Sequence, residues 1–294
     1  MTASSSNADT AKGAVEPQKK PAAVLNLSEL NKTSASLGSW HFRVVHEDLI
    51  SYEYVNAGRQ CSGHKLRVMF VTHDEEQYCL GYLRAIKNDV DELKKARSKW
   101  VVGSIWKSKR ISFLEEKANY VCTPFKLVLD LRKSELTKIL QGAEDLPKQA
   151  APGSQISEIL QIRSSGGIHR FDAMGMVQTG NVRYSDTKDG FRAIMDVTLM
   201  DGSELENGKK AEITFAVFAP ANKSGEQPEL MKQLKDAEGK ILSFFALNAS
   251  NPDGGINVSS SKEYFWQEST STKAKNLAKK RKSCRVLHLT TAKN

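Results

Sequence analysis

The stretch Lys65–Lys99, KLRVMFVTHDEEQYCLGYLRAIKNDVDELKKARSK, decides the fold of this chain. Lys65–Thr72 and Gln77–Leu83 show a strand-like apolar pattern, and the polar HDEE between them predicts a turn. Arg84–Lys99 then changes to helical spacing. The apolar residues that follow this spacing are Ile86, Val90, Leu93 and Ala96. The first half of the chain is therefore predicted to contain two neighbouring strands followed directly by a helix.

Three more strands are predicted around this stretch. They cover Trp40–Tyr54 before it, and Trp100–Ile105 and Asn119–Leu131 after it, while Asn56–His64 reads as a turn-rich loop. The result is five short strands with a helix between the third and the fourth. This is the order of the OB-fold, a five-stranded Greek-key barrel.

The second half of the chain repeats this order. Its predicted helix is Glu229–Ala237, and Gln178–Gly190 is predicted to be a turn-rich loop. The predicted strands are Ile168–Val177, Phe191–Met200, Ala211–Phe218, Ile241–Leu247 and Ile256–Phe265. We therefore expect an all-β protein with short helices, made of two tandem five-stranded OB-fold barrels.

The composition divides the chain into five segments. Residues 1–36 are rich in Ala, Ser, Lys and Asn, which is typical of a disordered segment. The predicted segments are a disordered leader at 1–36, a first OB-fold at 37–131, a helical, Pro/Gly-containing connector at 132–166, a second OB-fold at 167–270 and a basic tail at 271–294.

The net charge of +9 lies mostly in the tail. Residues 271–294 carry +8, whereas residues 151–270 carry −4. The folded middle is close to neutral, so binding of nucleic acid must depend on local patches of charge. No run of 18 apolar residues is present, so we expect no membrane span, and the N-terminus has no apolar core of a secretory signal.

The sequence has no pattern typical of an enzyme or a metal site. The four cysteines, at 61, 79, 122 and 284, form no CxxC pair, and the six histidines form no HExxH motif. No GxxxxGK[ST] or GxGxxG loop is present. We therefore expect reduced thiols, no catalytic residues, no metal and no cofactor.

Two stretches at the end of the second strand of each half carry a resemblance to a known family. They are RVMFVTHDEE (67–76) and, more completely, MDVTLMDGS (195–203). On these motifs the chain resembles the tandem single-strand-binding domains of the replication protein A large subunit, a family that binds by base stacking and phosphate contacts. The resemblance covers residues 37–268 and implies a nuclear, non-enzymatic single-stranded DNA-binding protein of replication, repair and recombination. We expect no counterpart of that family's N-terminal barrel in residues 1–36, and the cysteine count predicts no zinc-containing C-terminal barrel within this sequence.

The resemblance also implies which aromatic residues stack on bases. The family carries one near the end of the third strand, where this chain has Tyr82 and Phe218, and one in the hairpin of strands four and five, where it has Tyr120. The second half has no aromatic residue near Pro252 to match Tyr120. From the residues alone, Trp106 among lysines is either a groove aromatic or a core residue, and core packing is the alternative for the others as well.

The basic residues of the loops and of the hairpin arm are the candidates for phosphate contacts. Guanidinium and ammonium groups suit phosphate, and Arg also stacks on bases. The candidates are Arg59, Lys65 and Arg67 beside the first loop, Lys107, Lys109 and Arg110 on the hairpin arm, and Arg183, Lys188 and Arg192 in the second half.

A basic cluster in the tail predicts either a nuclear localisation signal or a nucleic-acid-binding arm. It consists of Lys279, Lys280, Arg281 and Lys282. Single-stranded DNA and replication or repair proteins are the expected partners. An RNA-binding or telomere-end-binding protein, and an OB-fold scaffold for protein interactions, remain as alternatives.

Overall fold

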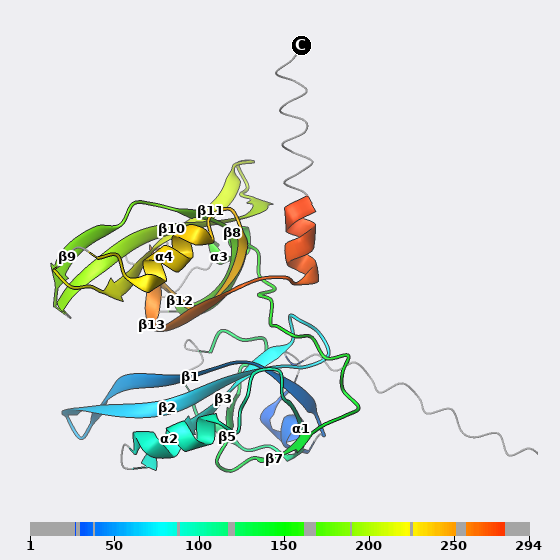
Figure 1. Ribbon diagram of the computed structural model, residues 1–294. Coiled ribbons are helices and arrows are strands. Elements are labelled where there is room, and N and C mark those ends of the chain that lie inside the picture. The colour runs from blue at the N-terminus through cyan, green and yellow to red at the C-terminus, as the bar shows by residue number, and fades with distance from the viewer. Residues whose placement is uncertain are drawn as a thin grey trace, which may run out of the picture.

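The computed structural model describes two β units joined by a connector. It covers residues 27, 30–37, 39–86, 89–116, 121–161, 169–188, 190–223, 226–250 and 257–279. Figure 1 shows the two units one above the other, with the connector along one side. In the described part of the chain, no helix has the length and apolarity needed to cross a membrane.

The first unit is a strongly curved seven-stranded sheet. Its elements are α1 (Lys32–Leu37), β1 (His41–Asn56), β2 (Arg59–Val71), β3 (Tyr78–Arg84), α2 (Val90–Arg97), β4 (Ile105–Arg110), β5 (Phe113–Leu114), β6 (Val128–Asp130) and β7 (Glu135–Ile139). The strand order is β5-β6-β3-β2-β1-β4-β7, and β3 pairs with β6 in parallel. The fourth barrel strand is broken in two, because β4 pairs with β1 and β5 pairs with β6.

The second unit is a closed barrel with an added strand. Its elements are α3 (Ile156–Ile159), β8 (His169–Thr179), β9 (Arg183–Thr187), β10 (Gly190–Glu204), β11 (Lys210–Pro220), α4 (Glu229–Asp236), β12 (Ile241–Ser250) and β13 (Asn257–Glu268). The ring runs β8-β10-β11-β13-β12 and back to β8, and β9 extends it beside β10. The parallel pair β11–β13 and the helix between the third and fourth barrel strands match the OB-fold. The fold class predicted from the sequence is confirmed.

The prediction of a loop at Asn56–His64 is wrong. β1 and β2 continue as one long hairpin, and only Ala57 and Gly58 turn the chain. Both have positive φ, 48° and 76°, which gives the two-residue turn whose twist matches that of paired strands. The prediction of a loop at Gln178–Gly190 is also wrong, because β9 lies within it and pairs with β10.

Other boundaries differ because tertiary pairing overrides the local pattern. Within the predicted helical connector, residues 135–139 form β7 on the edge of the first sheet, and of its described residues only 156–159 are α-helical. The predicted strand Trp100–Ile105 starts at Ile105. Of the strand predicted at Asn119–Leu131, the described part pairs only over Val128–Asp130. Helical spacing and strand alternation are hard to separate in such short apolar runs.

The two ends of the folded region reach further than the composition predicts. Leu27 and Ala35, within the predicted leader, are both 2% exposed and lie in the core of the first unit. In the predicted tail, residues 272–279 are helical, and Nζ of Lys273 donates to the carbonyl of Pro152 at 2.9 Å. The terminal helix therefore packs on the connector.

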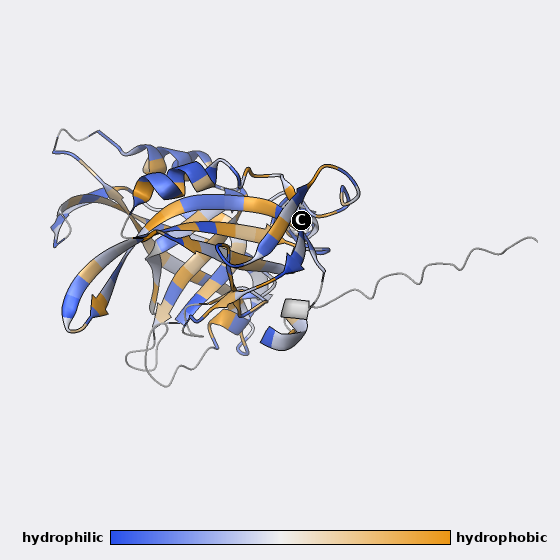
Figure 2. Ribbon diagram, turned by 90° about the horizontal axis from the view of Figure 1, so that it is seen from below, coloured by the Kyte–Doolittle hydropathy of each residue, from blue (hydrophilic) through white to orange (hydrophobic). Residues whose placement is uncertain are grey.

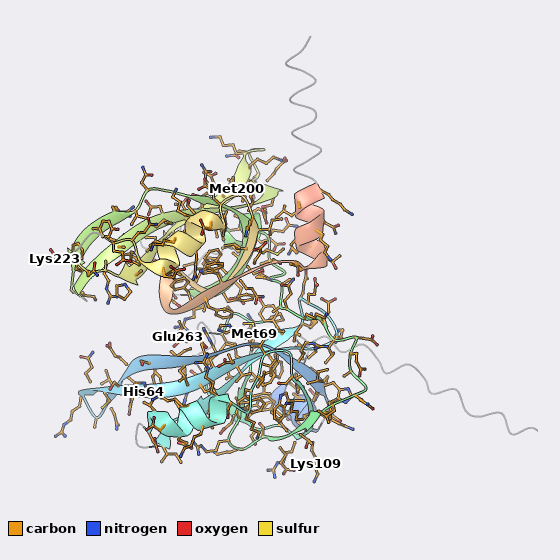
Figure 3. All side chains as sticks on the ribbon, viewed as in Figure 1. His64, Met69, Lys109, Met200, Lys223 and Glu263 are labelled. Atoms are coloured by element: carbon orange, nitrogen blue, oxygen red, sulfur yellow. The ribbon has the colours of Figure 1, made fainter. Side chains whose placement is uncertain are left out.

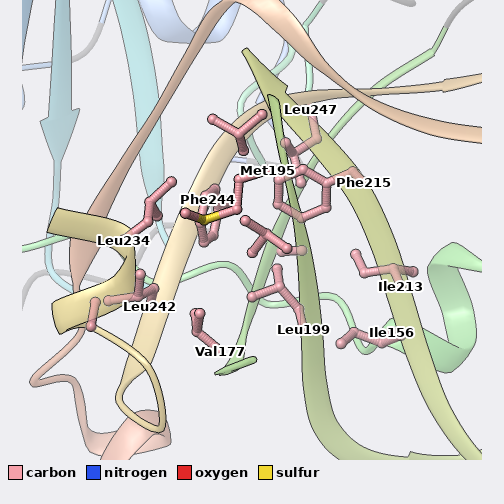
Figure 4. Close-up of a cluster of buried hydrophobic side chains, with 14 of the residues drawn as sticks. Ile156, Val177, Met195, Leu199, Ile213, Phe215, Leu234, Leu242, Phe244 and Leu247 are labelled. Carbon is pink, nitrogen blue, oxygen red and sulfur yellow. The ribbon is translucent and has the colours of Figure 1, made fainter. Parts of the chain in front are cut away.

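Each barrel has its own apolar core, and a third cluster joins the two. Figure 2 shows apolar and polar residues interleaved along the ribbons. Buried and exposed residues alternate along β11, so one face of this strand turns inward, whereas β3 and β12 are buried on both faces over most of their length. In the second barrel Met195, Phe215 and Phe244 meet at the centre (Figure 4). The third cluster includes Met69 and Tyr82 of the first unit and Phe245 of the second. The two units therefore share buried apolar surface.

Candidate nucleic-acid interface

The outer face of β9, β10 and β11 is an exposed sheet surface that carries an aromatic residue. Ile194 pairs with Phe218 on one side and with Arg183 on the other, so the three residues form one row across the sheet. Paired residues of antiparallel strands point to the same face. Phe218 is 43% exposed, whereas Phe215, on the inward face of the same strand, is 2% exposed. An exposed flat ring at this position is available for stacking.

Basic side chains border this row on the same hairpin. The guanidinium of Arg183 holds the carboxylate of Asp196 with two hydrogen bonds, of 2.5 and 3.0 Å. The hydrogen bond from Arg183 lowers the pKa of Asp196, which is thus a carboxylate at neutral pH. Arg192 lies one row along, paired with Pro220, and Lys188 is exposed at the turn. The structure places Arg183 and Arg192 on the same outer face as Phe218, and Lys188 at the turn of the same hairpin.

The inner face of the same hairpin carries an aromatic pair that the sequence reasoning missed. The rings of Tyr184 and Phe191 lie 6.0 Å apart at an interplanar angle of 11°, and Tyr184 is 38% exposed. Nζ of Lys223 lies 6.0 Å from the centre of the Phe191 ring. Figure 3 shows Lys223 at the outer end of the second unit. The sequence signal for this pair is an aromatic residue on each side of the polar stretch DTKDG (186–190), Tyr184 before it and Phe191 after it.

The expectation that Tyr82, Lys65 and Arg67 lie on an exposed groove is wrong. These residues are 3%, 7% and 1% exposed, because β2 and β3 face the second unit. Nζ of Lys65 lies 3.9 Å above the centre of the Tyr82 ring and 3.2 Å from Oε1 of Glu263. Arg67 donates to the backbone oxygen of Glu263 at 2.6 Å and to both carboxylate oxygens of Asp48. β13 of the second barrel covers the face predicted to bind DNA.

Trp106 is a core residue, so the alternative open at the sequence level is the correct one. It is 3% exposed, and its ring lies 4.4 Å from that of Trp100. Its indole Nε1 donates to Oγ of Ser104 at 2.9 Å. Lys99 covers the outer side, 5.4 Å from the ring centre. The neighbouring lysines project to solvent because strand alternation sends them to the opposite face.

The remaining basic candidates of the first unit are exposed, and Arg59 lies one same-face row from Tyr54, which is 44% exposed. Lys107, Lys109 and Arg110 project from β4, and Nζ of Lys109 lies 3.7 Å from Oε2 of Glu135. Figure 3 shows Lys109 at the far end of the first unit from the second. Arg59 is exposed beside the turn of the long β1–β2 hairpin.

Some of the predicted residues lie outside the described part of the chain. Tyr120 is one of them, and so are Lys280, Arg281 and Lys282 of the tail cluster. Lys279 is described, and it is exposed at the end of the terminal helix.

The junction contains buried acids that no sequence motif indicated. Asp172 is 5% exposed and accepts hydrogen bonds from the Tyr78 hydroxyl at 2.7 Å, the Cys122 thiol at 2.9 Å and the Ala246 amide at 2.8 Å. Burial raises the pKa of Asp172 in spite of these donors. Burial alone also favours the neutral form of Glu263, but Lys65 and Arg170 outweigh it and lower its pKa. The sequence signal that could have indicated these buried acids is the position of Asp172 and Glu263 within strands that are otherwise largely apolar.

The described residues also form one cleft of the opposite charge. Its volume is about 1220 Å³, and it lies between the β2–β3 turn, the connector and the terminal helix. Its walls carry Asp74, Glu75, Glu76, Asp145 and Asp201. A polyanion is repelled there. The described residues hold no cluster of His, Cys, Asp and Glu suited to a metal ion.

No protein-family model and no curated protein matches the sequence, but solved structures resemble the structure of this chain. A replication protein A heterotrimer bound to single-stranded DNA matches with a TM-score of 0.43 and 11% sequence identity. The match covers 88% of this chain but only 55% of the chain in that structure. A murine DNA-binding protein bound to double-stranded DNA matches with a TM-score of 0.36 and 13% identity, covering 78% of this chain and 97% of that one. The p202 HIN1 domain in complex with a 12-mer double-stranded DNA matches with a TM-score of 0.39 and 10% sequence identity, covering 79% of this chain and 92% of that one. At these identities and TM-scores the likeness concerns the fold alone, and says nothing about the ligand of this chain.

Proposed function

We propose that this protein binds single-stranded DNA on the outer face of β9, β10 and β11 in the second barrel. The observation that carries the proposal is the row Phe218–Ile194–Arg183, with a ring 43% exposed at one end and a guanidinium at the other. Single-strand binding needs a flat π-face for bases and cations for phosphates on an open groove. Arg192 and Lys188 add cations on the same hairpin.

The pairing of Arg183 with Asp196 supports a site that is held ready for a ligand. A bidentate pair fixes the guanidinium plane beside the sheet without covering the ring of Phe218. The ion pair is exposed, so its own contribution to stability is small. A phosphate can therefore compete for Arg183 at little expense in folding free energy.

We further propose a role without catalysis, in which the protein coats exposed strands during replication, repair or recombination. The basic cluster that begins at Lys279 supports two readings, a nuclear import signal or an arm that contacts phosphate. Import would place the protein in the nucleus, where single-stranded DNA forms. RNA is the second candidate ligand, because stacking on Phe218 accepts any base.

Fluorescence anisotropy with matched oligothymidylate, oligouridylate and duplex, at two salt concentrations, tests the proposal. We expect at least tenfold preference for oligothymidylate over duplex. Phe218→Ala should weaken single-strand binding by about 1–3 kcal/mol, the usual loss per stacked base, and Phe218→Tyr should restore it. Leu140→Ala, at an 88% exposed apolar residue after β7, is the matched control and should change nothing.

Three outcomes would count against the proposal. Equal affinity for single strand and duplex would show that the protein does not bind by stacking on single-stranded bases. Stronger binding to oligouridylate than to oligothymidylate would show that RNA is the preferred ligand. Binding that survives Phe218→Ala unchanged moves the site away from this face. If the protein binds none of the three oligonucleotides, the better-supported hypothesis is that it is an OB-fold scaffold for protein interactions.

A further inference from the structure

Two side chains of β13 occupy the face of the first barrel that β2 and β3 form. Glu263 and Phe265 are two residues apart, so they point to the same side of the strand. The carboxylate of Glu263 lies 3.2 Å from Nζ of Lys65 and 2.8 Å from NH1 of Arg170. Figure 3 places Glu263 between the two units. An anion is therefore held here by a buried lysine of the first unit and a half-buried arginine of the second.

The ring of Phe265 is stacked on both sides. It lies 3.6 Å from the ring of His46, with an interplanar angle of 5°, and 4.7 Å from the ring of Phe245, at 14°. The guanidinium carbon of Arg67 lies 4.6 Å from its centre. His46 and Arg67 belong to the first unit, so this unit binds a flat ring contributed by its neighbour.

An anion between cations and a flat ring in a stack are the two elements of single-strand recognition. Lys65 and Arg67 are almost fully buried, and buried cations need such partners. We propose that the β2–β3 face of the first barrel is a second single-strand-binding face. In the closed form β13 covers it, with Glu263 in the place of a phosphate and Phe265 in the place of a base. This inference rests on the proposed function, since it assigns the same class of ligand to the first barrel.

The closed form predominates because apolar contacts add to the charges. Tyr78 packs edge-on against Phe245 at 5.8 Å, and Val71 and Leu80 are buried in the same cluster. A ligand that needs the open form binds with an affinity reduced by the fraction of open molecules. A short strand is then bound by the second barrel alone, and a long strand gains affinity only as the junction opens.

Variants of the two β13 side chains test this directly. Glu263→Gln removes the charge that neutralises Lys65, and Phe265→Ala removes the stacked ring. Each should raise the affinity for a 30-nucleotide oligothymidylate about tenfold, because the open fraction rises, and should enlarge the number of nucleotides covered. Glu268→Gln is the matched control, since Glu268 is an exposed carboxylate on the same strand, 3.1 Å from Nζ of Lys240. It should leave the affinity unchanged.

A reversible cross-link supplies the opposite test in a single protein. Sγ of Cys122 lies 2.9 Å from Oδ1 of Asp172, across the junction. In a protein with Cys61→Ser and Cys284→Ser, the D172C variant can form a disulfide with Cys122 when an added disulfide reagent, oxidised glutathione, is reduced to two thiols by the exchange; mass measurement and thiol titration verify the bond. The oxidised form should bind the 30-nucleotide strand no more tightly than a 10-nucleotide strand. Reduction should raise the affinity for the long strand several-fold.

Equal long-strand affinities of the oxidised and reduced forms would overturn the inference, even if E263Q and F265A fail to fold. Folded E263Q and F265A proteins that bind like the natural protein would overturn it as well. The proposed function has a separate readout, the loss of short-strand binding in Phe218→Ala. In that background E263Q should still produce its gain for the long strand, so the failure of one proposal is distinguishable from the failure of the other.

Discussion

The hydroxyl of Tyr78 donates a 2.7 Å hydrogen bond to Oδ2 of Asp172, which lies 94 residues further along the chain and in the other barrel. Both groups are fully shielded from solvent in this junction. The same carboxylate also accepts from the backbone amide of Ala246, a residue with a φ of 59°. One buried acid therefore fixes a strained position in β12 and connects it to β3 of the first unit.

Tyr78→Phe should destabilise the protein by about 1–3 kcal/mol, because the carboxylate of Asp172 loses a donor that water cannot replace. Since Tyr78 belongs to the cluster shared by both units, unfolding should remain a single transition at a lower temperature. Circular dichroism and urea titration measure this. Tyr54→Phe, at a ring 44% exposed on the β1–β2 hairpin, is the control. Two separate transitions in the natural protein would contradict a shared junction.

Asp172 should make stability depend on pH in a defined direction. Its pKa is raised by burial above the value of an unfolded Asp, about 3.9, so the folded state favours the protonated form. Its contribution to stability is complete below the unfolded pKa and is lost as the pH rises through the folded pKa. The stability of the natural protein minus that of Asp172→Asn should therefore fall from pH 4 toward pH 7.

Urea titrations of both proteins across this range provide that difference. Asp48 and Glu263 have lowered pKa values and act in the opposite direction, but they are present in both proteins and cancel. A difference that rises with pH would mean that the three donors to Asp172 outweigh its burial.

Trp106→Ala should reduce stability by about 3–5 kcal/mol, the usual loss for a large aromatic residue in a core. The ring contacts Trp100 and lies within the apolar core of the first unit. Binding measured per folded molecule should stay as it is, in contrast to Phe218→Ala, which should weaken binding and leave the melting temperature in place. Loss of affinity in a stable Trp106→Ala protein would restore this residue as a binding candidate.

Truncation after Lys279 should separate the basic end of the chain from the barrels. It removes five Lys and Arg residues and keeps the helix whose Lys273 contacts Pro152. Each phosphate neutralised on a single strand contributes about −0.7 to the slope of log K against log salt, so the slope should become shallower by about 1–2 units if two or three of these charges contact phosphate. The ratio of single-strand to duplex affinity should rise.

The removed segment, residues 280–294, contains no Phe, Trp or Tyr, so it has no such side chain that could stack on a base. An unchanged salt slope with loss of nuclear import in cells would assign these residues to targeting. If the truncated protein shows no preference for single strands, the barrels are not the binding site.

The sequence by itself determined the succession of the five barrel strands along the chain in each half, the helix after the third strand and the apolar pattern that builds each core. These features depend on neighbours a few residues apart, so the local pattern contains them. Short pairings such as β7 and β9 were missed because an edge strand depends on the strand beside it, as Glu135–Ile139 depends on β4.

The tertiary structure alone decided which of two similar sites is open. Tyr82 and Phe218 both stand near the end of the third barrel strand, just before a helix, and their local sequences do not distinguish them. Tyr82 is 3% exposed because the second barrel covers it, whereas Phe218 is 43% exposed because no element of the described part of the chain lies over β11 there. The contact that makes this difference joins Lys65 to Glu263 over 198 residues. Burial of a charge by a partner so distant in the chain is a property of packing, and no pattern of neighbouring residues encodes it.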